Sequence, residues 1–339
     1  MKNPLFKIRE GGKYGFINSE GEVMIEPQYF DAEAFYNNFS RVRFNDKLVP
    51  LDCMGRLLMK HLFNHVGYFE DGLAKAQLVK RWGYIDRRGS LAIDVQFDEA
   101  GDFHQGLAPV SIEGQFGYIN KQGDFVIAPQ FETAQEFKGD LAAVSIDGQY
   151  GFIDQSGTLV IEPQFESADS FQGNVAVIRS GEKWGLISTK GDVLIAPQFD
   201  IIEGFSEGDF FDGMALVSQN EQYGFINDQG EIVIDPIYDF AGDFGESLAL
   251  VEINEKFGYI NKAGQLVILP KFEDAGVFSD GLAQIKVKDK WGFITTDGNF
   301  AIPASFEDVL PFKNGLAWVS IDQKWAYIDR FGDVIWRES

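Results

Sequence analysis

The amino-acid sequence predicts an all-β protein made of ten three-stranded antiparallel meander repeats, each about 34 residues long. Two observations predict this class. An aromatic residue followed by glycine recurs along the chain in fixed register, as in Tyr150-Gly151. Each copy also contains a second glycine and usually a proline, which interrupt helices and are typical of turns and strand ends. A helical repeat of the same period is therefore excluded.

The period is measured on the glycine of the aromatic–glycine pair. The equivalent positions are Gly15, Val49, Gly83, Gly117, Gly151, Gly185, Gly224, Gly258, Gly292 and Ala326. Every step is 34 residues except the 39 residues between Gly185 and Gly224. The five extra residues are assigned to an insertion at 206–210. It separates repeats one to six (1–205) from repeats seven to ten (211–339) within one continuous repeat domain.

Repeat five illustrates the strands that each copy predicts. The run 141–146 is the first strand, and Asp147-Gly148 is a signal for a tight hairpin. The second strand covers 150–153. Asp154 and Gly157 then bracket a type I turn that ends in a left-handed glycine. The third strand covers 159–165, and a connection without regular structure leads to the next repeat.

Aromatic side chains mark the predicted core. One phenylalanine of the connection recurs in nine repeats, at Phe35, Phe69, Phe103, Phe137, Phe171, Phe205, Phe244, Phe278 and Phe312. Because 34 residues enclose too little apolar volume to be stable alone, we expect these rings to pack against the next repeat. Such stacking predicts an elongated or superhelical array. A closed propeller-like ring is the alternative, although its blades usually have four strands.

Composition restricts the function. The chain has 52 acidic and 29 basic residues and a formal net charge of −23, so nucleic acids and anionic membranes would be repelled. A single cysteine excludes an internal disulfide framework and suits a reducing compartment. The N-terminal sequence MKNPLFKIREGG lacks the apolar core of a secretory signal. We therefore expect a cytoplasmic protein.

The chain resembles the bacterial WG-repeat (KWG) family, whose signature is KWGxI(D/N)xxGxxVIxPxF. Lys183-Trp184-Gly185 and Lys290-Trp291-Gly292 match it literally, and other repeats have Tyr or Phe in place of Trp. Repeat two, KLVPLDCMGRLLMKHLF, departs most. The resemblance implies a repeat scaffold and supplies no catalytic residues.

An acidic residue follows the aromatic end of the third strand in most repeats. These residues are Asp98, Glu132, Glu166, Asp200, Asp239, Glu273 and Glu307. They could cap the following turn or short helix, or pair with the basic residue that opens the second strand, such as Lys183. They could instead form a strip that binds a basic partner. If they form a binding strip, the candidate binding residues are Glu132, Glu166, Asp200, Asp239, Glu273 and Glu307, together with Phe210 and Phe211 at the insertion.

Other candidate sites are less favoured. Cys53, His61 and His65 are close in sequence, but they have no recognisable ligand spacing and no group that would orient a catalytic base. The Asp and Asn residues that open the turns suit turn geometry better than a calcium loop. We expect no catalytic residues, no metal and no cofactor.

These observations predict a non-enzymatic scaffold that binds a protein, with an immunity-type inhibitor of a basic protein as one version. The alternative is a module that binds carbohydrate or the cell envelope through exposed aromatic rings. The sequence leaves the partner and the oligomeric state open.

Overall fold

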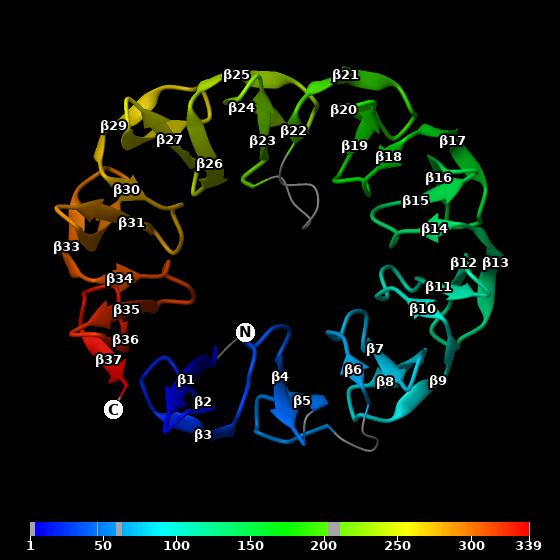
Figure 1. Ribbon diagram of the computed structural model, residues 1–339, viewed down its shortest axis with the longest axis horizontal. Coiled ribbons are helices and arrows are strands. Elements are labelled where there is room, and N and C mark those ends of the chain that lie inside the picture. The colour runs from blue at the N-terminus through cyan, green and yellow to red at the C-terminus, as the bar shows by residue number, and fades with distance from the viewer. Residues whose placement is uncertain (1–3, 46, 59–62, 203–210, 339) are drawn as a thin grey trace. The chain divides into compact units, whose positions relative to one another are not determined.

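The structure, a computed structural model, describes residues 4–45, 47–58, 63–202 and 211–338. These residues form small antiparallel sheets, ten in number, that follow one another along the chain (Figure 1). The predicted all-β class and the sequential repeats are confirmed. The chain divides into two compact units, Met1–Phe171 and Gln172–Ser339. No helix in the described part is long and apolar enough to cross a membrane.

The first unit contains repeats one to five. Its first strands are β1 (Phe6–Glu10), β4 (Phe39–Phe44), β7 (Leu73–Leu78), β11 (Ala108–Ile112) and β15 (Leu141–Ile146). Its second strands are β2 (Lys13–Ile17), β5 (Lys47–Asp52), β8 (Arg81–Asp86), β12 (Gln115–Ile119) and β16 (Gln149–Asp154). Its third strands are β3 (Val23–Tyr29), β9 (Leu91–Phe97), β13 (Phe125–Phe131) and β17 (Leu159–Phe165). Its short strands are β6 (His65–Val66), β10 (Glu99–Ala100), β14 (Thr133–Ala134) and β18 (Ser167–Ala168).

The second unit contains repeats six to ten. Its first strands are β19 (Val175–Ser180), β23 (Met214–Gln219), β27 (Leu248–Ile253), β31 (Leu282–Val287) and β35 (Ala317–Ile321). Its second strands are β20 (Lys183–Ser188), β24 (Gln222–Asn227), β28 (Lys256–Asn261), β32 (Lys290–Thr295) and β36 (Lys324–Ile328). Its third strands are β21 (Val193–Phe199), β25 (Ile232–Tyr238), β29 (Leu266–Phe272), β33 (Phe300–Phe306) and β37 (Val334–Arg337). Its short strands are β22 (Ile201–Ile202), β26 (Phe240–Gly245), β30 (Asp274–Ala275) and β34 (Asp308–Val309).

The short strands were not expected. Where the sequence predicts an irregular connection, two residues such as Glu99 and Ala100 extend and pair with Ser111 and Val110 of the next first strand. A sheet therefore has the order short, first, second and third strand, as in β10-β11-β12-β13. The connection thus joins the sheet of the following repeat and ties successive repeats by backbone hydrogen bonds.

Both predicted turns have the expected geometry. Asp147 and Gly148 have φ angles of 51° and 74°, so the hairpin between β15 and β16 is of the type that needs two residues with positive φ. In the second turn the Gly157 N–H donates to the Asp154 carbonyl at 2.9 Å. The Asp154 Oδ1 atom accepts backbone N–H groups from Ser156 and Thr158. The side chain therefore serves the turn, as predicted for the Asp and Asn series.

The reference glycine permits a close approach within one repeat. A Cβ atom at Gly151 would lie 2.5 Å from the Ile161 carbonyl oxygen and 2.7 Å from the Pro163 nitrogen. The third strand bulges here, because Tyr150 pairs with Phe165 and Phe152 pairs with Ile161. Proline suits the position because it has no N–H that needs a partner.

Repeat two departs from the predicted three strands. Its described residues form the two-stranded sheet β4-β5, and isolated bridges join Ala32 to Val42, Tyr36 to Phe39 and Leu51 to Leu57. Val49 replaces the glycine and would bring a Cβ atom into the space that a third strand occupies elsewhere. Pro50 follows it and cannot donate a backbone hydrogen bond.

The core lies between successive repeats. In seven repeats an aromatic ring of the second strand packs against the connector phenylalanine, and the ring centroids of Tyr118 and Phe137 are 4.8 Å apart. The same cluster includes Ala142 and Val144 of the next repeat. Eight of the nine connector rings are buried, namely Phe35, Phe69, Phe103, Phe137, Phe171, Phe244, Phe278 and Phe312. The ninth, Phe205, lies outside the described residues. Each repeat therefore completes the core of its neighbour.

Replacement of a connector ring is expected to be costly. Phe137→Ala should lower the free energy of unfolding by about 3–5 kcal/mol, because it removes a buried ring and leaves a cavity between two repeats. Urea unfolding followed by circular dichroism measures the change. The control is Phe331→Ala, because Phe331 is 86% exposed and its loss should change stability by less than about 0.5 kcal/mol. Equal effects of the two variants would contradict the shared core.

Candidate functional site

The predicted acidic column reaches the hairpin of the next repeat. The Glu132 carboxylate accepts the Gly148 N–H at 2.8 Å, and that of Glu307 accepts the Gln323 N–H at 2.9 Å. Asp98, Asp200 and Glu273 accept hairpin N–H groups in the same way. No helix follows these residues in the described chain, so what they cap is a hairpin about 15 to 20 residues further on.

Two members of this column also form the predicted ion pairs. Asp98 pairs with Arg81, and Asp200 pairs with Lys183, each basic residue opening a second strand. The hydrogen bond from Lys183, together with that from the Asn220 N–H, holds the pKa of Asp200 below its usual value. Backbone N–H groups of Asp289 and Lys288 lower the pKa of Glu273. These carboxylates are thus ionised and placed by the fold.

The remaining predicted contact residues lie on the surface. Glu166 and Asp239 are exposed. Phe211 is 43% exposed and pairs with Met214 in an isolated bridge, the position that polar residues such as Glu70 and Lys138 hold elsewhere. Phe211 therefore has the backbone pairing of the equivalent residues in other repeats. Phe210 and the insertion 206–210 lie outside the described residues, and a binding role for all these residues stays a prediction.

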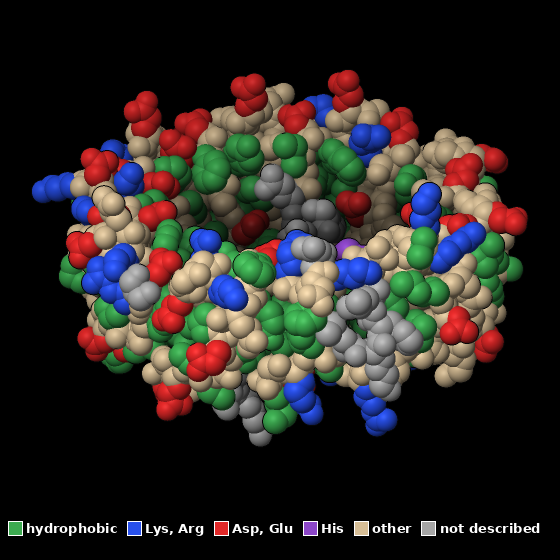
Figure 2. Space-filling model, turned by 60° about the horizontal axis from the view of Figure 1, so that its bottom comes forward, with side chains coloured by type: hydrophobic (Ala, Val, Ile, Leu, Met, Phe, Trp, Pro, Cys, Tyr) green, Lys and Arg blue, Asp and Glu red, His purple; other side chains and the backbone are tan. Residues whose placement is uncertain are grey.

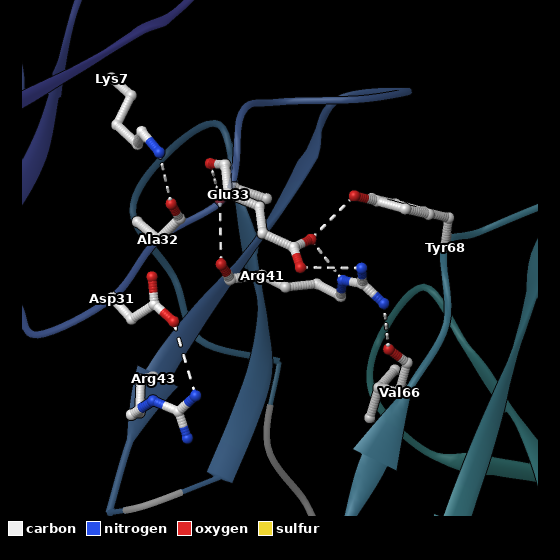
Figure 3. A network of polar contacts seen from close by, with 9 residues as sticks. Lys7, Asp31, Ala32, Glu33, Arg41, Arg43, Val66 and Tyr68 are labelled. Atoms are coloured by element: carbon white, nitrogen blue, oxygen red, sulfur yellow. Dashed lines mark hydrogen bonds and ion pairs between the residues drawn. The ribbon is translucent and has the colours of Figure 1, made fainter.

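A polar network that the sequence did not indicate lies in the first unit (Figure 3). Arg41 of β4 binds Glu33 of the preceding connection with two hydrogen bonds, from Nε at 2.5 Å and from Nη2 at 2.8 Å. Its third nitrogen donates to the Val66 carbonyl at 3.0 Å. Tyr68 donates its hydroxyl to Glu33 at 2.8 Å, and its ring lies 4.2 Å from the Arg41 guanidinium.

Members of this network shift one another's pKa values. Burial raises the pKa of Glu33, but hydrogen bonds from Arg41 and Tyr68 outweigh burial and leave the pKa below its usual value. Burial and the hydrogen bond to Glu33 raise the pKa of Tyr68. Burial lowers the pKa of the nearby His65, and the charges of Arg41 and Lys75 lower it further. The arrangement favours ionised Glu33 beside a neutral His65.

The polar row continues into repeats three and four. Lys75 pairs with Asp102 at 3.1 Å, and Glu136 accepts the Asp102 N–H at 3.1 Å. A Cβ atom at Gly101 would lie 2.9 Å from the Glu136 carboxylate, so glycine there admits the acidic side chain of the next repeat. The Asp102 Oδ1 atom is buried without a hydrogen-bond partner among the described residues. These residues link one connection to the next.

One sequence signal could have revealed the row. In repeats two and three, Arg41 and Lys75 occupy a first-strand position that is buried Ala143 or Val177 in repeats five and six. A charge at a position that is elsewhere apolar requires a partner. Its partner was not evident because Glu33 lies in a connection that the sequence leaves irregular.

The disfavoured cluster of repeat two is only partly described. Cys53 is exposed, and His65 packs edge-on to the Trp82 ring at 5.5 Å. His61 lies outside the described residues. Within those residues no three His, Cys, Asp or Glu side chains form a group that could hold a metal ion.

The surface carries many acidic side chains. Figure 2 shows Asp and Glu spread over the visible face, with Lys, Arg and hydrophobic side chains between them. Several large apolar side chains of the third strands are exposed as well, among them Met24, Val126, Val193, Ile232 and Leu266. The surface therefore offers both negative charge and apolar contact area.

A sequence profile described as the WG containing repeat matches eight segments of the chain. They are residues 14–47, 82–115, 116–150, 150–184, 184–223, 223–257, 257–291 and 291–325. Residues 48–81, which include most of repeat two, are not matched. A search of curated proteins found no match to the sequence.

Solved structures resemble the chain in fold alone. One described as the crystal structure of the eukaryotic initiation factor has a TM-score of 0.58 and 11% identity, covering 100% of this chain and 96% of that chain. Hsv2 of Kluyveromyces lactis has a TM-score of 0.37 and 11% identity, over 88% and 99% of the two chains. PorZ of Porphyromonas gingivalis has a TM-score of 0.33 and 10% identity, over 99% and 52%.

The Glu33–Arg41 pair is expected to make stability depend on pH. Because the folded pKa of Glu33 lies below its unfolded value, the stabilisation is present above about pH 4.3 and is lost as pH falls through the folded pKa. Glu33→Gln should lower the free energy of unfolding by on the order of 1 kcal/mol at pH 7. The difference from the unmodified protein should shrink towards pH 3.

Thermal melting between pH 7 and pH 3 measures this difference. Glu20→Gln is the matched control, because the Glu20 side chain is exposed, and it should change the melting temperature little at any pH. A Glu33→Gln effect that stays constant across this range would contradict the ionised pair.

Proposed function

Because the chain belongs to the WG containing repeat family, we propose that it is a non-enzymatic scaffold that binds a basic protein. The observation that carries the proposal is the excess of acidic side chains on a surface built of repeated sheets. The chain has 52 acidic and 29 basic residues. Five of the acidic residues after the third strands, Asp98, Glu132, Asp200, Glu273 and Glu307, accept backbone N–H groups of a hairpin, so their charges have defined positions.

Fixed charges favour recognition of a complementary partner. A partner with Lys and Arg side chains would be drawn to the surface by long-range attraction, which raises the association rate. Exposed apolar side chains beside the carboxylates would then add contacts that salt does not screen. A sharper version of the proposal is an immunity-type inhibitor that neutralises a basic toxin in the cytoplasm.

A second candidate function is the binding of carbohydrate or cell envelope through aromatic rings. It is favoured by repeat ten, where Trp318, Trp325 and Trp336 are half-buried. The ring planes of Trp325 and Trp336 lie within 9° and 13° of the Trp318 plane, and each centroid is 5.7 Å from that of Trp318. The part of these indole rings that solvent reaches would be suited to stacking on sugar rings. Trp fluorescence that resists quenching by acrylamide would argue against this candidate.

Affinity capture from the native host followed by mass spectrometry is the test of protein binding. The expected result is a basic partner whose affinity falls at least about tenfold when the salt concentration is raised from 50 mM to 500 mM. Calorimetric titration of the purified pair measures this dependence. An acidic partner, or an affinity that does not change with salt, would overturn the proposal.

A further inference from the structure

The third strands of repeats six to eight share a row of exposed apolar side chains. We call this row the apolar ribbon and define it as Val193 and Leu194 of β21, Ile232 and Val233 of β25, and Leu266 and Val267 of β29. Each of these side chains is between 41% and 59% exposed. The next residue in each strand, Ile195, Ile234 or Ile268, is buried in the core.

The position of these strands makes the ribbon accessible. In the sheet that contains each of them, the third strand is at the edge of the strand order, as in β22-β23-β24-β25 and β26-β27-β28-β29. The solvent-facing positions of such an edge normally carry polar residues. The ribbon also extends towards the next repeat, because Leu194 would lie 3.0 Å from a Cβ atom at Gly230 in the following turn.

Acidic side chains border the ribbon. Asp192 precedes Val193, Glu231 precedes Ile232, and Asp235 follows Ile234, and all three are exposed. Among the described residues of the second unit, the ion pairs involve Asp200, Asp212, Asp289 and Asp322. None of these pairs neutralises the carboxylates beside the ribbon. The Glu231 carboxylate accepts a hydrogen bond from the Asn227 amide at 2.9 Å, and that of Asp192 accepts one from the Ser188 hydroxyl at 3.5 Å, and neither donor carries a charge. The edge thus combines exposed apolar area with negatively charged side chains.

The strands themselves limit how a partner can bind. Pro197, Pro236 and Pro270 lie within the three strands, and each leaves its strand with one backbone N–H fewer. Side chains therefore offer the main contacts, with apolar groups of a partner on the ribbon and its cations on the carboxylates.

We propose that the apolar ribbon is the docking surface for a cationic amphipathic segment of the protein partner. In this segment Lys or Arg alternates with apolar residues, so that one set of side chains meets the ribbon and the other meets Asp192, Glu231 and Asp235. The inference rests on the proposed function, because it names the surface and the chemistry by which a basic partner is held.

The probe is a fluorescent peptide of about twelve residues in which lysine alternates with leucine. Two matched peptides replace leucine by serine, or lysine by glutamate. Fluorescence anisotropy against the full chain should show binding of the lysine–leucine peptide at least about tenfold tighter than either matched peptide. Equal binding of the lysine–serine peptide, or no binding of the lysine–leucine peptide, would overturn the inference.

Two variants of the chain locate the contact. The triple variant Val193→Thr, Val233→Thr and Val267→Thr keeps the β-branched shape and should weaken lysine–leucine binding about fivefold, with no change for lysine–serine. The double variant Glu231→Gln and Asp235→Asn should weaken both lysine peptides and reduce the salt dependence. Circular dichroism confirms that each variant is folded.

The control is Val79→Thr, because Val79 is 76% exposed and lies outside the ribbon in the first unit. It should leave peptide binding unchanged. If a captured basic partner binds the triple variant as tightly as the unmodified chain, the ribbon is not the docking surface and the proposed function still stands. If capture yields no basic partner, the proposed function fails by its own test, whatever the peptides show.

Discussion

The contact on which the structure depends is the packing of a connector phenylalanine against the second-strand ring that precedes it. The centroids of seven such pairs, including Phe16–Phe35 and Phe293–Phe312, are 4.7–4.8 Å apart. The pair belongs to a cluster that the first and second strands of the next repeat complete. No repeat therefore has a core of its own. The apolar area whose burial stabilises the fold lies at the contact between adjacent repeats.

Polar groups add direction to this apolar contact. Carboxylates such as Glu132 cross to the next hairpin, and the short strands pair with the next first strand. Both interactions fix the register of one repeat on another, which a non-directional apolar contact cannot do. The Glu33–Arg41–Tyr68 network makes a similar link between the connection before β4 and the segment that contains Val66 and Tyr68. Hydrogen bonds to charged side chains thus join neighbouring segments there.

The sequence predicts the structural features that depend on residues close together in the chain. The turn at Asp154 and Gly157 and the hairpin at Asp147 and Gly148 follow from local backbone preferences, and the connector rings follow from periodicity. The short strands could not be predicted, because Glu99 and Ala100 extend only when β11 is beside them. The Glu33–Arg41 pair was missed for the same reason. Both depend on pairing between segments that the repeat pattern alone does not bring together.

The shared core has a consequence for how such a chain can change in length. Within each unit, a junction such as that between repeats four and five or between repeats eight and nine joins the same two surfaces, with a ring and isoleucine on one side and small aliphatic residues on the other. Duplication or loss of a whole 34-residue module would therefore create a junction that already exists elsewhere in the chain. A gain of a few residues within a strand would instead shift side chains to the wrong face. Growth by complete modules preserves the fold, while smaller changes in length are confined to the connections.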